Sequence, residues 1–198
     1  MIQVFPGRGS VHRPLATGYL IDGKIAIDAP EGVEYPSPWA IFLTHEHCDH
    51  ICGMASHACP AYANRAASEQ IELGNTFCDY LNMKAPPPRK IIAVSDGQEL
   101  RFGGFTLRTI LTPGHSPGSM CIYLKELQYL FSGDTVFPGL DLPNLSLPRS
   151  NPSQLMDSYE KLSKLEIEKF FPGHGEPFSG PGYMEKLKEE LSALLQQT

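Results

Sequence analysis

The segment 44–50 concentrates side chains that bind metal ions within the sequence T-H-E-H-C-D-H. Its candidate ligands are His45, His47, Asp49 and His50. Neutral imidazole and carboxylate groups are ligands that Zn(II), Fe(II) and Mn(II) accept. The apolar run 39–43 directly before the segment has the length of a buried strand. If the chain stays extended, residues 45, 47 and 49 project to one side, and a turn at His50 aims that ring differently.

Three later turns place a ligand-type side chain after an apolar strand and a glycine. They read T-P-G-H-S-P-G, S-G-D-T and P-G-H-G, and they contribute His115, Asp134 and His174. Glycine and proline favour sharp turns that can aim a side chain away from the edge of a sheet. A single histidine in a turn is usually only exposed to solvent, whereas three turns of the same design favour a shared site. Seven ligands are too many for one tetrahedral ion and suit two divalent ions about 3.5–4 Å apart that share a carboxylate.

The rest of the sequence predicts short strands and a few helices. The expected strands are 2–5, 16–21, 24–27, 39–43, 61–63, 91–94, 98–102, 105–111, 120–124, 129–131 and 170–171. The expected helices are 51–56, most of 66–83, one capped by Asn151 with Pro152 at its first position, and 182–195. Asp22-Gly23 is a strong hairpin signal. This order predicts a layered α/β protein whose sheets are largely antiparallel or mixed.

Composition limits the class of protein. The 198 residues, 41% of them hydrophobic, predict a single domain over 1–198 with a sizeable core. The net charge of −6 and the absence of a basic run argue against a nucleic-acid partner. We find no secretion signal and no apolar stretch long enough to span a bilayer, so we expect no membrane association. Five scattered cysteines, an odd number, favour free thiols in a cytoplasmic protein over a disulfide framework.

The four motifs together resemble the metallo-β-lactamase superfamily, and most closely its glyoxalase II-like hydrolases. The match runs through residues 44–177, and the opening hairpin with Asp28 extends it to nearly the whole chain. The resemblance implies an α/β fold, a four-layer αβ/βα sandwich of two mixed β-sheets with the site at one edge. It also implies a first metal held by His45, His47 and His115, a second held by Asp49, His50 and His174, and Asp134 as the bridge.

The implied activity is that of a metallo-hydrolase acting on a small molecule. A hydroxide held between two divalent ions would attack the carbonyl of an ester, thioester or lactone. We expect Zn(II) ahead of Fe or Mn, with Asp49 and Asp134 orienting the nucleophile. Only one helix has room after Glu176, where glyoxalase II carries a glutathione-binding helical domain. A glutathione thioester is therefore not the expected substrate.

Several other residues receive supporting roles. Substrate selection is expected from the loops 7–14, 83–90 and 137–150. Within them, Arg8, Arg13 and Arg149 could bind an anionic group of the substrate. Asp28 is expected to orient a ligand histidine. Glu46 should point away from the metals, either into solvent or in support of the site. Cys48 and Cys52 are expected to pack rather than to bind metal, and Cys78 to be an unpaired thiol.

Three alternatives stay open at this point. A persulfide dioxygenase of the same fold would use one Fe(II) bound by two histidines and an aspartate, so metal content and oxygen uptake separate it from a hydrolase. A nuclease is disfavoured by the acidic balance. A non-enzymatic metal-binding or interaction module would be expected to have lost ligands. The last helix could also form a homodimer through its apolar stripe, although packing on its own domain is the default.

Overall fold

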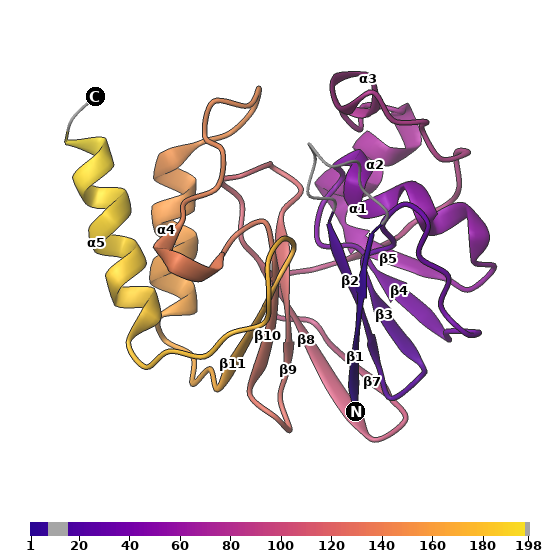
Figure 1. The fold of residues 1–198 in the computed structure, drawn as a ribbon, viewed down its shortest axis with the longest axis horizontal. Helices are drawn as coiled ribbons and strands as arrows, with labels where there is room; N and C mark the ends of the chain where they lie inside the picture. The colour runs from indigo at the N-terminus through magenta and orange to yellow at the C-terminus, as the bar shows by residue number, and fades with distance from the viewer. Residues whose placement is uncertain (8–15, 197–198) are drawn as a thin grey trace.

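The structure is a computed structural model that describes residues 1–7 and 16–196. Two β-sheets lie at its centre (Figure 1). The first sheet has the order β1-β2-β3-β4-β5-β6, with β1 to β3 antiparallel and β3 to β6 parallel. Its strands are β1 (Ile2–Pro6), β2 (Thr17–Ile21), β3 (Ile25–Ile27), β4 (Ala40–Phe42), β5 (Ala61–Asn64) and β6 (Ile92–Val94).

The second sheet has the order β11-β10-β9-β8-β7. Only β10 and β11 are parallel neighbours; the other pairs are antiparallel. Its strands are β7 (Glu99–Phe102), β8 (Phe105–Leu111), β9 (Met120–Leu124), β10 (Tyr129–Gly133) and β11 (Lys169–Pro172). Because β8 and β10 both run antiparallel to β9, the strands β8, β10 and β11 all end at the same edge.

Helices cover the outer faces of both sheets (Figure 1). On the side of the first sheet lie α1 (Cys48–Ile51), the 3-10 turn η1 (Cys52–Ser56), α2 (Arg65–Leu73) and α3 (Cys78–Leu81). On the side of the second lie η2 (Pro138–Leu140), α4 (Pro152–Leu162) and α5 (Tyr183–Leu195). The predicted αβ/βα sandwich of two mixed sheets is confirmed. Within residues 1–7 and 16–196, none of these helices has the length and apolar character needed to cross a membrane.

Three apolar layers hold the sandwich together. Tyr19, Phe42 and Phe131 belong to the layer between the sheets, where side chains of both sheets meet. A second layer lies between the first sheet and α1 and α2, and a third between the second sheet and α4 and α5. Three residues of the apolar stripe of α5, Met184, Leu187 and Leu191, are buried in this third layer, as expected for packing on its own domain, whereas Leu194 is exposed. Dimerisation through this helix stays a prediction.

Two predicted helices have different boundaries in the structure. The expected helix over 66–83 stops at Leu73, because Gly74 adopts a left-handed conformation (φ +76°) that ends a helix. The chain then forms the short helix α3. The helix expected to begin at Ile51 begins at Cys48 instead, so it includes two candidate ligands.

Candidate metal centre

The ligand turns converge at one edge of the sandwich. Each follows a strand that ends there: β4 precedes the segment 44–50, and β8, β10 and β11 precede the other three turns. Backbone hydrogen bonds join the two sheets at this edge. Met120 N–H donates to Thr44 O at 2.8 Å, and Thr17 N–H donates to Gly173 O at 2.6 Å. Side chains more than a hundred residues apart in sequence therefore meet.

Three histidines form the first cluster. His45, His47 and His115 are buried and offer ring nitrogens that lie within 4.8 Å of one another. His47 Nδ1 lies 3.0 Å from His115 Nε2, and the ring centroids of His45 and His47 are 4.5 Å apart. Three neutral imidazoles at this spacing suit a tetrahedral ion that keeps its fourth position open.

Asp49, His50 and His174 form the second cluster, and Asp134 lies between the two clusters. His174 Nε2 is 3.3 Å from Asp49 Oδ2 and 3.5 Å from Asp134 Oδ2. Asp134 Oδ2 is also 3.6 Å from His115 Nε2, which belongs to the first cluster. The structure thus brings together all seven residues that the sequence predicts as metal ligands.

The backbone that carries the second cluster differs from the conformation predicted from the sequence. Residues 45, 47 and 49 were expected along one extended chain, but only His45 and His47 precede the helix. Asp49 and His50 lie on α1, where consecutive side chains diverge by about 100°. The helix therefore aims Asp49 and His50 at different neighbours, and the extended-strand explanation is wrong for this half of the segment.

Asp28 supports the site as predicted. Its Oδ2 lies 2.7 Å from His50 Nδ1 and accepts a hydrogen bond from Thr44 Oγ1 at 2.8 Å, while Oδ1 accepts one from Thr44 N–H at 2.7 Å. Asp28 is buried and has a left-handed backbone (φ 56°), a conformation that Asp tolerates better than most residues. A carboxylate on Nδ1 leaves Nε2 of His50 to face Asp49 and Asp134.

Two glycines permit the close approach of the ligand turns. A Cβ atom on Gly133 would lie 2.5 Å from Thr44 Oγ1. A Cβ atom on Gly173 would overlap with Asp134 Oδ1 and would lie 2.7 Å from His50 Cε1. The glycine that precedes the ligand in these turns is therefore required by packing as well as by turn geometry.

The two clusters differ in the protonation of their histidines. Burial and neighbouring rings lower the pKa of His45 well below its usual value and that of His47 to about 3, so both are neutral at pH 7. Burial opposes the charge of His174 too, but Asp134 and Asp49 raise its pKa to about 9. Asp134 and Asp49 likewise raise the pKa of His50. Without a metal, the second cluster therefore neutralises its carboxylates with protonated histidines.

Several buried ring nitrogens lack a hydrogen-bond partner among the described residues. They include Nε2 of His45 and Nε2 of His47, whereas Nε2 of His50 and Oδ1 of Asp134 lie 3.2 Å apart as an ion pair. A buried polar atom without a partner is costly. A cation seated among these atoms would satisfy them, and the imidazole and carboxylate donors fit a divalent ion.

Glu46 is buried behind the clusters. Its Oε2 accepts a hydrogen bond from Ser116 Oγ at 2.9 Å, and its Oε1 lies 3.6 Å from Arg149 Nη2. Burial raises the pKa of this carboxyl. Of the two roles expected for Glu46, exposure to solvent is wrong, and support of the turn that carries His115 is correct. Of the three candidate arginines, only Arg149 can be placed, because Arg8 and Arg13 lie outside the described residues.

The prediction that all five cysteines are free thiols is wrong. Cys48 and Cys78 form a disulfide that joins α1 to α3, while Cys52, Cys59 and Cys121 are free. The sequence gives no signal for this pair, because its members lie 30 residues apart and any pairing among five cysteines is formally open. Cys52 is not a ligand: its sulfur donates to Cys48 O at 2.6 Å.

A cavity of about 300 Å³ opens beside the clusters. His47, Asp49, His115, Asp134 and His174 line its floor, and its walls are mostly apolar and aromatic. The loop 137–150 contributes Phe137, Asn144 and Leu147 to the lining. The opposite wall comes from Phe77, Tyr80 and Leu81 rather than from the expected loop 83–90. These three residues were not predicted to line the site, because the helical pattern over 66–83 places them at the end of a long helix.

The sequence matches the family model of the metallo-beta-lactamase superfamily over residues 28–174. The matched region begins at Asp28, ends at His174 and includes all seven clustered side chains. The protein belongs to the metallo-beta-lactamase superfamily. Its fold also resembles the crystal structure of BLEG-1 B3 metallo-beta-lactamase, with a TM-score of 0.78, 25% identity, and coverage of 90% of this chain and 94% of that one.

Curated relatives include several hydrolases. The chain is 31% identical over 156 residues to the probable polyketide biosynthesis zinc-dependent hydrolase BaeB of Bacillus velezensis, covering 79% of this chain and 62% of that protein. It is 33% identical over 153 residues to the hydroxyacylglutathione hydrolase of Bartonella quintana, covering 72% of this chain and 54% of that protein. It is 29% identical over 163 residues to the acyl-coenzyme A thioesterase MBLAC2 of Bos taurus, covering 71% of this chain and 57% of that protein. The chain thus spans between 54% and 62% of the length of these relatives.

Proposed function

We propose that the protein is a dinuclear metal-dependent hydrolase that cleaves the thioester, ester or lactone bond of a small molecule. The first ion would be held by His45, His47 and His115, the second by Asp49, His50 and His174, and Asp134 would bridge them. The observation that carries the proposal is the position of Asp134, whose Oδ2 lies within 3.6 Å of both His115 Nε2 and His174 Nε2.

The donor set favours zinc. Imidazole nitrogens with a minority of carboxylate oxygens are the usual ligands of Zn(II), and Fe or Mn are the alternatives for the more oxygen-rich second cluster. When bound, two such cations would lower the pKa of water toward about 7 and polarise a carbonyl group. Within the described residues, no serine or cysteine nucleophile is needed for this chemistry.

The remaining steps depend on residues of the chain. Asp49 and Asp134 reduce the positive charge of the loaded site, and Asp49 Oδ2, at the floor of the cavity, can accept a hydrogen bond from the attacking water. The cavity seats the carbonyl carbon next to this floor. Phe137 and Leu147 exclude bulk water from one side. After attack, the leaving thiolate or alkoxide departs toward the open mouth of the cavity.

Acyl thioesters are the substrates we favour. One of the relatives is named an acyl-coenzyme A thioesterase, and the cavity walls are mostly apolar, as an acyl group requires. Arg149 lies at the rim, 5.7 Å from the Phe77 ring, next to a second cavity lined by Gln70 and Asn75. We propose that Arg149 binds an anionic group on the leaving thiol, and extend the same expectation to Arg8 and Arg13.

The test compares Asp134→Ala with the exposed control Asp157→Ala. We expect the first variant to lose bound metal and the hydrolysis of thioesters, esters and lactones together, and the control to keep both. Unchanged hydrolysis in Asp134→Ala overturns the proposal. A wild-type chain that binds one iron and consumes oxygen with a persulfide is a dioxygenase instead, and one that binds metal without any turnover is a binding module.

A further inference from the structure

One wall of the substrate cavity is a short segment with little support of its own. Phe77 precedes α3, Tyr80 and Leu81 lie within it, and all three line the cavity. Tyr80 is 67% exposed although its ring is large and mostly apolar. An exposed aromatic side chain at the mouth of a cavity is a surface that a ligand can cover.

The backbone of this segment makes few connections to the rest of the molecule. Among the described residues, the backbone hydrogen bonds of Leu81, Asn82 and Met83 N–H stay within the segment, on the carbonyls of Phe77, Asp79 and Cys78. Phe77 and Asn82 both have left-handed backbones, with φ of 57° and 51°. Such a conformation costs energy for a bulky residue and persists only where the surroundings impose it.

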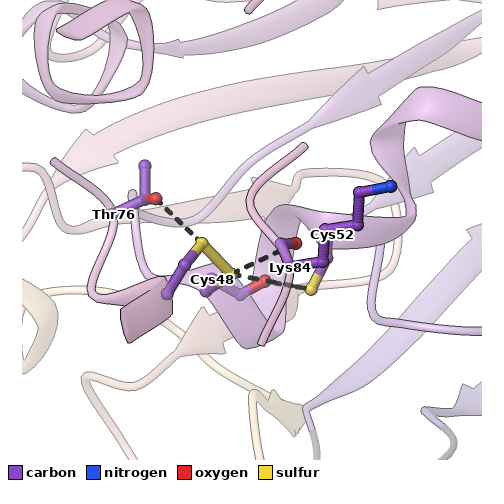
Figure 2. Close-up of a disulfide and its surroundings, with 5 residues drawn as sticks. Cys48, Cys52, Thr76 and Lys84 are labelled. Carbon is purple, nitrogen blue, oxygen red and sulfur yellow. Dashed lines mark hydrogen bonds between the residues drawn. A yellow bond between two sulfur atoms is a disulfide. The ribbon is translucent and has the colours of Figure 1, made fainter. Parts of the chain in front are cut away.

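The Cys48–Cys78 disulfide links this segment covalently to α1. Cys78 directly follows the wall residue Phe77, and Cys48 lies between the candidate ligands His47 and Asp49. Figure 2 shows Thr76, Lys84 and Cys52 gathered around this bond; Thr76 Oγ1 is 3.0 Å from Cys78 Sγ, and Lys84 O is 3.9 Å from Cys48 Sγ. The centroid of the Phe77 ring lies 4.7 Å from that of the His47 ring.

We propose that the Cys48–Cys78 disulfide positions Phe77, Tyr80 and Leu81 as an acyl-binding wall, so that the oxidised protein selects long apolar acyl groups and the reduced protein does not. This inference rests on the proposed hydrolysis of acyl thioesters at the same site. A carbonyl held at the floor of the cavity directs its acyl chain along one of the walls. Each methylene that the wall covers should raise kcat/KM by roughly two- to fourfold.

The redox step is a simple reduction. A trialkylphosphine donates two electrons to the Cys48–Cys78 bond and is oxidised to the phosphine oxide with an oxygen from water, and two protons complete the thiols. A phosphine is preferable to a thiol reductant, which would compete for the metal ions. Once the bond is open, residues 77–83 lose their covalent link to α1 and are held by noncovalent contacts, among them their internal hydrogen bonds and the ring contact of Phe77 with His47.

The experiment measures kcat and KM for acetyl, hexanoyl and decanoyl thioesters of N-acetylcysteamine on the metal-loaded protein, before and after phosphine treatment. The matched variant is Cys52→Ser/Cys78→Ser, because the Cys52 sulfur lies 3.9 Å from that of Cys48 and could otherwise pair with it. Cys59→Ser, a free cysteine outside the cavity, is the control. We expect reduction and the double variant to raise KM for the decanoyl substrate at least tenfold and to leave the acetyl substrate within twofold.

Two further readouts do not depend on turnover. Amide hydrogen exchange of residues 77–83 should accelerate on reduction, and a decyl thioether of N-acetylcysteamine should bind the oxidised protein at least tenfold more tightly. If no thioester is hydrolysed, the proposed function fails, but these two measurements still test whether the disulfide positions the acyl-binding wall. The inference is overturned if five thiols titrate in the unreduced, denatured protein, or if reduction leaves both thioether binding and the decanoyl-to-acetyl ratio unchanged.

Discussion

Asp28 and His50 form a buried pair in which the carboxylate Oδ2 lies 2.7 Å from the ring Nδ1, although the two residues are 22 positions apart. The same carboxylate accepts hydrogen bonds from the backbone and the hydroxyl of Thr44. One side chain therefore connects the end of β3, the end of β4 and helix α1. The orientation of the second cluster depends on it.

Replacing Asp28 by Asn should weaken the second metal site selectively. Asn tolerates the same left-handed backbone, but its amide nitrogen cannot accept a hydrogen bond from His50 Nδ1–H. We expect the affinity for the second ion to fall by roughly 10–100-fold, as for other partners of metal-binding histidines, and the first ion to be retained. Titration with zinc, followed by calorimetry, measures both sites.

Asp22 offers a matched control for this variant. It is exposed, it lies in the β2–β3 turn, and it has a similar left-handed backbone (φ 49°). Asp22→Asn should leave both affinities unchanged. Equal loss of both ions in Asp28→Asn would contradict this prediction, because it would show that Asp28 maintains the fold of this edge of the sandwich rather than the orientation of His50 alone.

Replacing Gly173 by Ala should remove metal binding with little loss of secondary structure. The added methyl group would overlap with Asp134 Oδ1 and crowd His50, so the bridging carboxylate must move. Gly180→Ala is the control, because its backbone is not left-handed and a Cβ there lies no closer than 3.1 Å to its nearest neighbour, the Tyr183 ring. Metal content and far-ultraviolet circular dichroism report the two effects. Full metal content in Gly173→Ala would contradict the tight packing of these turns.

The metal-free protein should be most stable near pH 6.5. The pKa of His174 is raised to about 9, so its contribution is fully present below the unfolded value of about 6.5 and is lost as pH rises through 9. The pKa of His47 is lowered to about 3, so this buried neutral ring destabilises the fold as pH falls below about 6.5. Urea unfolding of chelator-treated protein from pH 5 to 9.5 measures the profile. A stability that keeps rising to pH 9 would contradict the assigned pKa shifts.

Opening the Cys48–Cys78 bond should also lower the stability of the whole protein. A crosslink with a sequence separation of 30 lowers the conformational entropy of the unfolded chain, which stabilises the fold by about 3.6 kcal/mol. For a single domain of this size, losing the crosslink corresponds to a fall in Tm of roughly 7–14 °C. Calorimetry with and without phosphine tests it, and Cys59→Ser should not reproduce the shift. An unchanged Tm would indicate that the crosslink does not form.

The metal ligands could be predicted because each stands at a position that local sequence defines. The segment 44–50 follows an apolar strand, and His115, Asp134 and His174 each follow a strand and a glycine, so the sequence itself predicts a shared site. Only the division of the ligands between the two ions required the family resemblance. The edge they share follows from strand directions, which local patterns do not reveal. Helix α1 was not predicted at Asp49 and His50, because a helix of one turn is too short to show a helical pattern in the sequence.

The cavity wall formed by Phe77, Tyr80 and Leu81 and the disulfide beside it could not be predicted from the sequence. Gly74 interrupts an otherwise helical pattern, and the pattern alone could not show that the chain turns back toward the metal centre. Cys48 and Cys78 become partners only once that turn is made. Phe77 in a left-handed conformation has no sequence signal, since the tertiary contacts impose it.

The central claim is that one pair of cations occupies the two clusters. Anomalous diffraction from crystals of the metal-loaded protein, collected at the absorption edge of the bound metal, tests it directly. We predict two peaks about 3.5–4 Å apart, one touching His45, His47 and His115, the other touching Asp49, His50 and His174, with Asp134 between them. A single peak, or peaks that touch none of these side chains, would contradict the account.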